Sequence, residues 1–207
     1  MKVAVIGAGP CGLASAKSCL EYGLEPVVFE KLNDIGGLWN YNEDTGVASV
    51  MKSTVINTSK EMTAFSDFPP PDDMPNFMHN KDVMNYLRSY AEHFKLLPHI
   101  KFNTEVVAVR RTDEYSSSKQ WIVEYRSNRD TTIQEIRVGG VMCCTGHHND
   151  PYVPALPGQE NFQGQIIHSV AYKTPYEYVD KNVLVVGIGN SGGDIAIELS
   201  RNANANK

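Results

Sequence analysis

The chain has 207 residues, of which 42% are hydrophobic and 21% are charged, and its formal net charge is -5. This size suits one or two globular domains, and the negative charge argues against a nucleic-acid partner, because a phosphate backbone attracts a basic surface. No stretch approaches the roughly 18 apolar residues of a membrane span, and the first apolar run, Val3 to Ala8, is too short for a signal peptide. We therefore expect an intracellular protein.

The amino-terminal residues predict a β-α-β unit. A short apolar run at Lys2–Ile6 indicates a buried strand, helical apolar spacing follows over Leu13–Tyr22, and "PVVFE" at Pro26–Glu30 indicates the next strand. Gly23 stands where a helix commonly ends. Such a unit begins a doubly wound parallel sheet of the α/β class.

The middle of the chain predicts a long connection, a helix and a small antiparallel meander. Residues 40–79 are rich in Pro, Asn, Asp and Ser, and helical spacing returns over Asn80–Leu97. The apolar stripe of that helix consists of Val83, Leu87, Tyr90, Ala91, Phe94 and Leu97. The runs "KFNTEVVAV", "QWIVEY" and "TIQEIRV" indicate the strands of the meander, and "VMCCTG" indicates a further buried strand.

The cysteines and the adjacent histidines do not predict a metal site. The four cysteines, Cys11, Cys19, Cys143 and Cys144, lack the spacing of a zinc site, and we expect them to be small buried side chains in a reducing compartment. His147 and His148 are expected to be a loop pair whose side chains diverge.

The proline-rich run "PYVPALPG" places a domain boundary near Pro151, which separates residues 1–150 from residues 151–207. Beyond it the chain repeats its own beginning, since "VAVIGAGPCG" and "VLVVGIGNSG" are related by an offset of 180 residues. The repeat predicts a second strand from Val183 and a second helix from Ser191, before the chain ends in "RNANANK". Two separate nucleotide-binding units are therefore expected.

The first glycine motif, G-x-G-x-x-G, lies between a predicted strand and a predicted helix, as dinucleotide binding requires. Gly7 permits the tight turn, Gly9 lets the backbone approach a pyrophosphate, and Gly12 allows the helix to pack closely. Glu30, at the end of the next strand, can accept hydrogen bonds from ribose hydroxyls and would repel a 2′-phosphate. The motif therefore favours FAD or NAD, while the alternative is a glycine turn without a ligand.

The run "DIGGLW" favours FAD over NAD. Two successive glycines, Gly36 and Gly37, allow a second backbone segment to approach the same ligand. A longer, permanently held FAD has use for such a second approach, whereas NAD has no obvious need of it.

Taken together, these motifs resemble the flavin-containing monooxygenases. The resemblance rests on the glycine motif with Glu30, on "GGLW", on "FQGQIIHSVAY" and on the second glycine motif. The third stretch matches the family signature F-x-G-x-x-x-H-x-x-x-Y through Phe162, Gly164, His168 and Tyr172. Related Baeyer-Villiger monooxygenases usually end this signature in tryptophan, so Tyr172 favours oxidation of nitrogen or sulfur.

The resemblance implies a Rossmann-type FAD-binding domain over residues 1–150, completed by a later return segment, and the linker and first strand and helix of an NADPH-binding domain over residues 151–207. In this family NADPH reduces FAD, O2 adds to give a C4a-hydroperoxyflavin, and a soft nucleophilic nitrogen or sulfur of a small molecule is oxygenated. Asn57 matches an asparagine beside the flavin and the nicotinamide, and is the catalytic candidate. Without the resemblance, Asn57 is a turn residue.

The resemblance also assigns the remaining cofactor contacts. Next to the first glycine motif, with its intervening Ala8, Pro10 and Cys11, the expected FAD contacts are Gly37, Leu38, Trp39 and Val106. Ile56 and Asn57 match a nicotinamide contact. The NADPH phosphate turn comprises Gly187, Gly189, Ser191, Gly192, Gly193 and Asp194. His168 is expected to be a structural hydrogen-bonding residue of the linker.

Two other interpretations remain open. A disulfide reductase with two dinucleotide sites shares both glycine motifs, but it needs a redox-active cysteine pair, and neither C-x-x-C nor C-x-x-x-x-C occurs in the sequence. A truncated, non-catalytic FAD-binding fragment is the other, and we expect the 207-residue chain alone to lack NADPH-dependent oxygenase activity. Animal members of the family attach to the endoplasmic reticulum membrane through a carboxy-terminal segment. The resemblance therefore implies that location, with the cytoplasm as the alternative.

Overall fold

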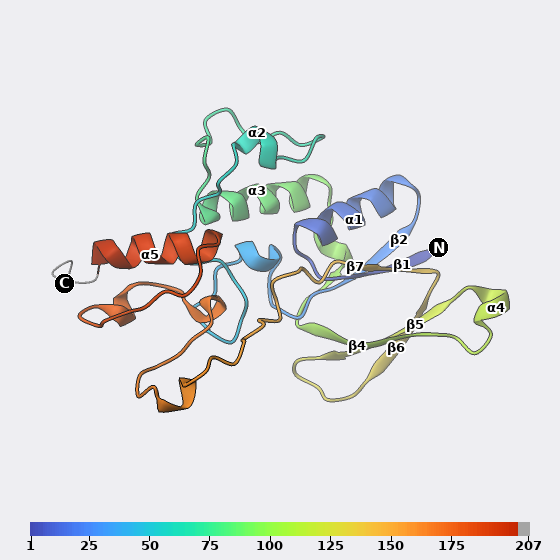
Figure 1. The fold of residues 1–207 in the computed structure, drawn as a ribbon. Coiled ribbons are helices and arrows are strands. Elements are labelled where there is room, and N and C mark those ends of the chain that lie inside the picture. The colour runs from blue at the N-terminus through green and yellow to red at the C-terminus, as the bar shows by residue number, and fades with distance from the viewer. Residues whose placement is uncertain (203–207) are drawn as a thin grey trace. The chain divides into compact units, whose positions relative to one another are not determined.

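The computed structural model describes residues 1–202 and divides the chain into two compact units (Figure 1). The first unit comprises residues 1–40 and 55–149, and the second comprises residues 41–54 together with the chain from residue 150 onward. This division differs from the predicted domain 1–150, because residues 41–54 form hydrogen bonds to Lys173 of the second unit.

The first unit is built on a parallel sheet of four strands. In spatial order these are β3 (Ile100–Lys101), β2 (Glu25–Phe29), β1 (Lys2–Ile6) and β7 (Gly140–Cys143). Helix α1 (Pro10–Glu21) connects β1 to β2, so the predicted β-α-β unit is confirmed. The parallel order also brings the carboxyl ends of β1, β2 and β7 to the same edge of the sheet.

Two helices cover one face of this sheet (Figure 1). Helix α3 (Asn80–His93) packs with α1 through a buried cluster that includes Leu13, Leu87 and Tyr90. The 3-10 helix η1 (Gly37–Trp39) precedes the long connection between residues 40 and 79, which contains one short helix, α2 (Lys60–Thr63). The helical apolar spacing in the sequence therefore predicted both helices of this layer, α1 and α3.

Helix α3 ends four residues before the predicted boundary. Lys95 adopts a left-handed conformation with φ of 54°, and the Leu96 N–H donates to the Ala91 carbonyl oxygen at 2.8 Å, which closes the helix. Leu96 is fully buried, whereas Leu97 is 40% exposed and begins the 3-10 helix η2 (Leu97–His99). Leu97 is therefore not part of the buried stripe.

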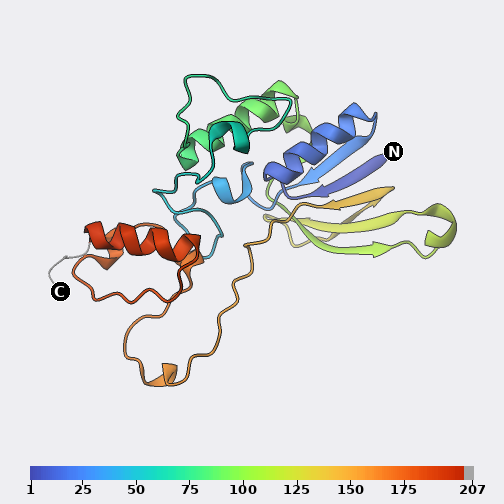
Figure 2. The same cartoon turned by 45° about the horizontal axis from the view of Figure 1, so that its top comes forward.

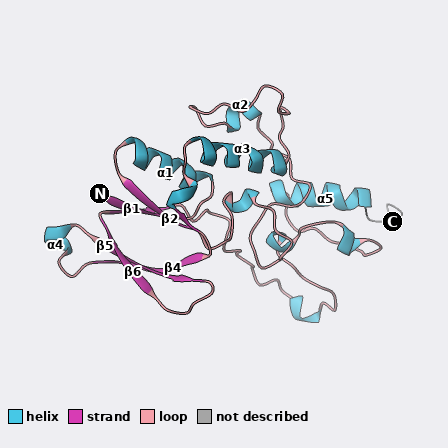
Figure 3. Ribbon diagram, turned by 180° about the vertical axis from the view of Figure 1, so that it is seen from behind, coloured by secondary structure: helices cyan, strands magenta, loops and turns pink. Residues whose placement is uncertain are grey.

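The other face of the parallel sheet packs on a separate antiparallel sheet (Figure 3). Its strands are β4 (Thr104–Arg111), β5 (Trp121–Ser127) and β6 (Gln134–Val138), in that order, with the short helix α4 (Tyr115–Ser118) in the first connection. Phe29 of β2 belongs to the same buried cluster as residues of β5 and β6. The predicted antiparallel meander is confirmed.

The second unit consists mainly of loops, with α5 (Asn190–Asn202) as its long helix (Figures 2 and 3). Three 3-10 turns punctuate the loops: η3 (Gln159–Asn161), η4 (Ser169–Ala171) and η5 (Tyr176–Tyr178). Its buried cluster is small and centres on Tyr172, Ile195 and Leu199.

The predicted strand from Val183 is wrong for the described chain. Residues 182–189 form no strand within residues 1–202, and Leu184 and Ile188 are 86% and 90% exposed. A strand needs a neighbour for its backbone hydrogen bonds, and the described residues pair none with this segment. The predicted helix is confirmed as α5, while residues 203–207 of the terminal run lie outside the described residues. Within residues 1–202 no helix has both the length and the apolar character to cross a membrane.

Two expectations about side chains also fail. Cys11 and Cys143 are exposed, so only Cys19 is fully buried and Cys144 is half-buried. Cys11 lies at the exposed start of α1 and Cys143 ends an edge strand, positions that a short apolar run does not reveal. The rings of His147 and His148 lie 3.9 Å apart and do not diverge, and no group of three metal-ligating side chains was found among residues 1–202.

Candidate cofactor-binding site

The first glycine turn closes tightly against the end of β7. Gly7 has φ of 101°, and a Cβ at this position would lie 2.5 Å from the Cys144 carbonyl oxygen. A Cβ on Gly12 would overlap the Gly7 carbonyl oxygen. Only glycine fits at these two positions, which explains the spacing in the motif.

The start of α1 offers free backbone donors. Gly9 is the N-cap residue and Pro10 opens the helix, and no side chain among residues 1–202 caps the first turn. The N–H groups of Cys11 and Gly12 therefore have no partner within the helix. Uncapped N–H groups and the positive end of the helix dipole favour an anion at this point.

A second backbone segment meets the first glycine turn, as Gly36 and Gly37 led us to predict. The Gly36 N–H donates to the Ala8 carbonyl oxygen at 3.0 Å, and both glycines have positive φ. A Cβ on Gly37 would lie 3.2 Å from the Gly9 Cα atom. Leu38 and Trp39 follow in η1 and are half-buried. The structure thus brings two glycine-lined backbones together at the sheet edge.

The carboxylate of Glu30 links the end of β2 to this turn. Glu30 is 5% exposed, and its two oxygens accept hydrogen bonds from the N–H groups of Ala8 and Leu32, each at 2.8 Å. The sequence motif predicted that Glu30 contacts a ribose, but it did not predict these two hydrogen bonds to the backbone. The sequence feature that could have indicated them is a carboxylate at the end of the strand beside the glycine turn.

Replacement of Glu30 tests both roles. Glu30→Ala removes a buried acceptor and leaves the Ala8 N–H without its partner, so we expect FAD affinity to fall by about 1.5–3 kcal/mol. Glu30→Gln retains one acceptor oxygen and should show a smaller loss. Isothermal titration of the deflavinated full-length protein measures the change, and unchanged affinity in Glu30→Ala would remove this side chain from the site.

A thiol lies behind the turn. The Cys144 Sγ atom lies 3.4 Å from the Ser15 Oγ atom of α1, and burial raises the pKa of this thiol. A neutral, half-buried thiol packs the helix against the strand without placing a negative charge behind the anion-binding turn.

The remaining expected contacts of the first unit lie on two segments. Ile56 is 6% exposed, packs in the cluster that contains Ala8, and donates its N–H to the Met78 carbonyl oxygen at 2.9 Å. Asn57 follows directly and is exposed. Val106 lies at a β-bulge in β4, two residues after Thr104, whose N–H donates to the Glu30 carbonyl oxygen at 2.8 Å.

The second glycine turn repeats the backbone geometry of the first. Gly187 has φ of 111°, and a Cβ on Gly192 would lie 2.5 Å from the Gly187 carbonyl oxygen. The Gly193 N–H donates to the Gly189 carbonyl oxygen at 2.9 Å, as the Leu13 N–H does to Gly9 at 3.0 Å. Ser191 and Asp194 are exposed on the first turn of α5. The second unit therefore also presents a helix start.

Two residues of the family signature hold the linker. The His168 Nδ1 atom accepts a hydrogen bond from the Val170 N–H at 3.2 Å, in agreement with the predicted structural role. The Tyr172 hydroxyl donates to the Glu198 Oε2 atom at 2.8 Å, and burial together with this carboxylate raises the pKa of the phenol. Both residues stabilise the path of the chain toward α5.

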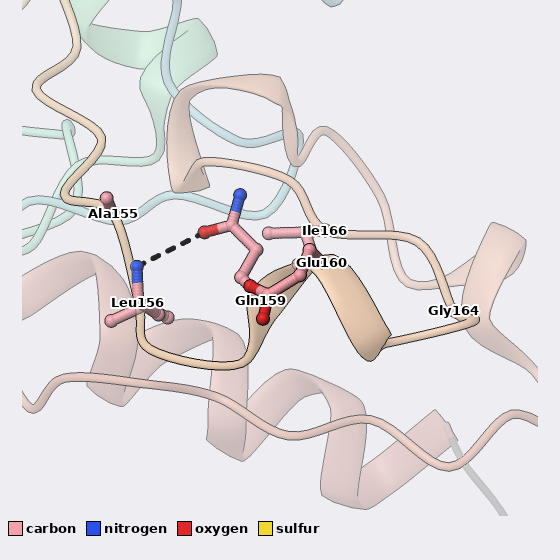
Figure 4. Close-up of a pocket in the computed structure, with 6 residues that line it drawn as sticks. All are labelled: Ala155, Leu156, Gln159, Glu160, Gly164 and Ile166. Atoms are coloured by element: carbon pink, nitrogen blue, oxygen red, sulfur yellow. Dashed lines mark hydrogen bonds between the residues drawn. The ribbon is translucent and has the colours of Figure 1, made fainter.

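An open pocket of about 390 Å³ occurs in the linker (Figure 4). It is lined by Ala155, Leu156, Gln159, Glu160, Gly164 and Ile166. The Leu156 N–H donates to the Gln159 side-chain oxygen at 3.3 Å and shapes its wall. None of the predicted cofactor contacts lines this pocket.

Comparison with known proteins gives relatives over nearly the whole chain. Flavin-containing monooxygenase 5 of Rattus norvegicus and dimethylaniline monooxygenase [N-oxide-forming] 2 of Macaca mulatta are each 50% identical over 98% of this chain. The structure of S-allyl-L-cysteine S-oxygenase from Allium sativum matches 98% of this chain and 49% of its own, with 27% identity and a TM-score of 0.88.

The chain spans 38% of the length of the two curated relatives. The sequence profile described as flavin-binding monooxygenase-like matches residues 1–206. Together with the glycine turns at the sheet edge and at the start of α5, this match shows that the chain belongs to the flavin-binding monooxygenase-like family.

Proposed function

We propose that this chain forms the cofactor-binding part of an FAD- and NADPH-dependent monooxygenase that oxygenates soft nitrogen or sulfur atoms of small molecules. The observation that carries the proposal is the meeting of Gly9 and Gly37 at an uncapped helix start, beside the buried Glu30 carboxylate. Family membership supports FAD and NADPH as the cofactors. The names of the macaque and garlic relatives support N-oxide and S-oxide formation.

The residues of the first unit fit FAD. The Cys11 and Gly12 N–H groups would face the pyrophosphate, and the glycine pair at Gly36 and Gly37 admits a ligand against the backbone. Each Glu30 oxygen accepts a hydrogen bond from one backbone N–H and retains capacity for a ribose hydroxyl. When bound, FAD supplies the redox chemistry by accepting a hydride from NADPH and activating O2.

Asn57 is the residue that we propose to act next to the flavin. Its primary amide both donates and accepts hydrogen bonds, and it is not an acid that could transfer a proton to the reacting groups. The exposure of Asn57 leaves the amide available to a cofactor, while the buried Ile56 anchors the backbone beside it. Asn57 would therefore orient the reacting groups without protonating them.

The second glycine turn is the proposed NADPH phosphate site, with Ser191 and Asp194 at the start of α5. Family membership favours this assignment over the disulfide reductase considered above. Location at the endoplasmic reticulum membrane, which the resemblance implies for animal members, is part of the same proposal.

The full-length protein tests the proposal directly. We expect purified protein to show the absorption spectrum of bound flavin near one equivalent, and excess NADPH under anaerobic conditions should bleach it. Well-folded, colourless protein that FAD cannot reconstitute would overturn the assignment. The 207-residue chain serves as a comparison, and we expect no NADPH-dependent bleaching from it.

A further inference from the structure

Residues 41–54, here called the connecting loop, join two segments that carry expected cofactor contacts. The chain leaves the first unit after Asn40, directly behind Leu38 and Trp39, and returns to it at Val55, directly before Ile56 and Asn57. Each end has one backbone contact in the first unit, since the Asn40 N–H donates to the Gly37 carbonyl oxygen at 3.1 Å and Val55 bridges to His79. The middle of the loop belongs to the second unit.

One residue of the second unit holds the middle of this loop. The Lys173 side-chain amine donates to the Val47 carbonyl oxygen and to the Ser49 Oγ atom, each at 2.8 Å. The Lys173 carbonyl oxygen accepts a hydrogen bond from the Lys52 N–H at 3.0 Å. Ser49 extends the contact, since its Oγ atom accepts from the Asn42 N–H at 3.2 Å. Lys173 therefore fixes the loop at several points along its length.

The environment of Lys173 is unusual for an amine. Lys173 is 6% exposed, and its amine donates to two neutral oxygens. Burial lowers the pKa of this amine, and the nearby negative charge of Asp44 offsets only part of that effect. A buried ammonium group costs free energy that an apolar side chain of the same volume avoids. The advantage of lysine here is that it holds two specific oxygens of the loop.

The neighbouring Tyr172 connects this contact to α5. Its ring packs in the cluster with Ile195 and Leu199, and its hydroxyl bonds to Glu198 on the same helix. Tyr172 thus contacts the helix that follows the second glycine turn, while Lys173 contacts the connecting loop. The two consecutive residues join both elements within the second unit.

We propose that Lys173 is a positioning residue for the flavin site, which acts by holding the connecting loop and so fixes the segments 37–40 and 55–57 at its two ends. The inference rests on the proposed function, because it takes these segments as cofactor contacts. A 14-residue loop without this anchor samples many more conformations, and both of its ends gain freedom. The effect would pass along the chain itself, because residue 54 of the loop is followed directly by residues 55–57.

Hydrogen–deuterium exchange of the full-length protein tests the proposal without an activity measurement. Lys173→Met keeps an unbranched side chain as far as the Cε position and removes the amine, and Lys181→Met, at an exposed lysine, is the matched control. We expect exchange in residues 41–54 to rise about tenfold in Lys173→Met, and exchange at 37–40 and 55–57 to rise with it. Faster exchange in the loop alone, or in neither region, would overturn the positioning role.

A second measurement separates positioning from simple stability. With FAD bound, Lys173→Met should retain its rate of NADPH oxidation within about twofold, while the share of NADPH that ends as hydrogen peroxide rises several-fold. Ser49→Ala removes one acceptor of the amine and should move both readouts in the same direction by less. An unchanged peroxide share in both variants would contradict the proposal. If the unmodified protein binds no FAD, the proposed function fails, and the exchange data alone then judge the role of Lys173 in the loop.

Discussion

Gly12→Ala should abolish FAD retention, and Gly192→Ala should leave FAD bound but prevent its reduction by NADPH. Each added Cβ meets the carbonyl oxygen of the first glycine in its own turn, Gly7 or Gly187, where backbone leaves no space. Overpacking against backbone costs about 3 kcal/mol, so we expect a loss of roughly 100-fold in affinity for the corresponding cofactor. Flavin content and anaerobic bleaching by NADPH measure the two effects in the full-length protein.

Gly23→Ala is the matched control for both substitutions. Gly23 has φ of 67°, but a Cβ there meets no atom within 4 Å in the described residues, so only backbone strain of about 1–2 kcal/mol is expected. Circular dichroism confirms folding in each case. If Gly12→Ala retained FAD while Gly192→Ala lost it, the assignment of the two turns would be reversed.

Asn57→Ala should uncouple NADPH consumption from oxygenation in the full-length protein. Loss of the amide removes a neutral donor and acceptor beside the proposed flavin site, and we expect product formed per NADPH to fall by about tenfold, with hydrogen peroxide in its place. Asn57 is exposed and not part of the buried core, so the melting temperature should change little. Product, peroxide and NADPH are quantified in the same reaction.

Asn161→Ala provides the control for this prediction, because Asn161 is an exposed asparagine of the linker outside the proposed site. It should keep the product ratio of the unmodified enzyme. A product ratio in Asn57→Ala equal to that of Asn161→Ala would show that the Asn57 amide does not act in the reaction.

The sequence predicted the first unit well where local signals and packing agree. Helix α1 ends just before Gly23, where the Leu24 N–H donates to the Cys19 carbonyl oxygen, and a glycine at this position is a sequence signal for the end of a helix. Helix α3 ends by the same type of bond around Lys95, which carries no such signal. The boundary was missed because a non-glycine residue adopts the left-handed conformation.

The parts that could not be predicted depend on contacts between distant residues. The glycine motif indicated where a cofactor approaches, but the bond from Ala8 to Glu30 requires the fold of two strands and a turn. Likewise, nothing local in "GVASVMKS" indicates that this loop packs on Lys173, more than 120 residues later in the chain. The prediction of a strand from Val183 failed for the opposite reason. Its local sequence pattern favours a strand, but no strand in the described chain pairs with it.

The second glycine turn shows that its geometry is a local property. Gly187 to Gly193 close with the same bond and the same sign of φ as the first turn, although residues 182–189 pair with no strand among residues 1–202. Local closure takes place within about a microsecond, whereas strand pairing over long separations is slower. During synthesis from the amino terminus, a glycine turn of this kind would therefore close before any strand pairs with it over a long separation.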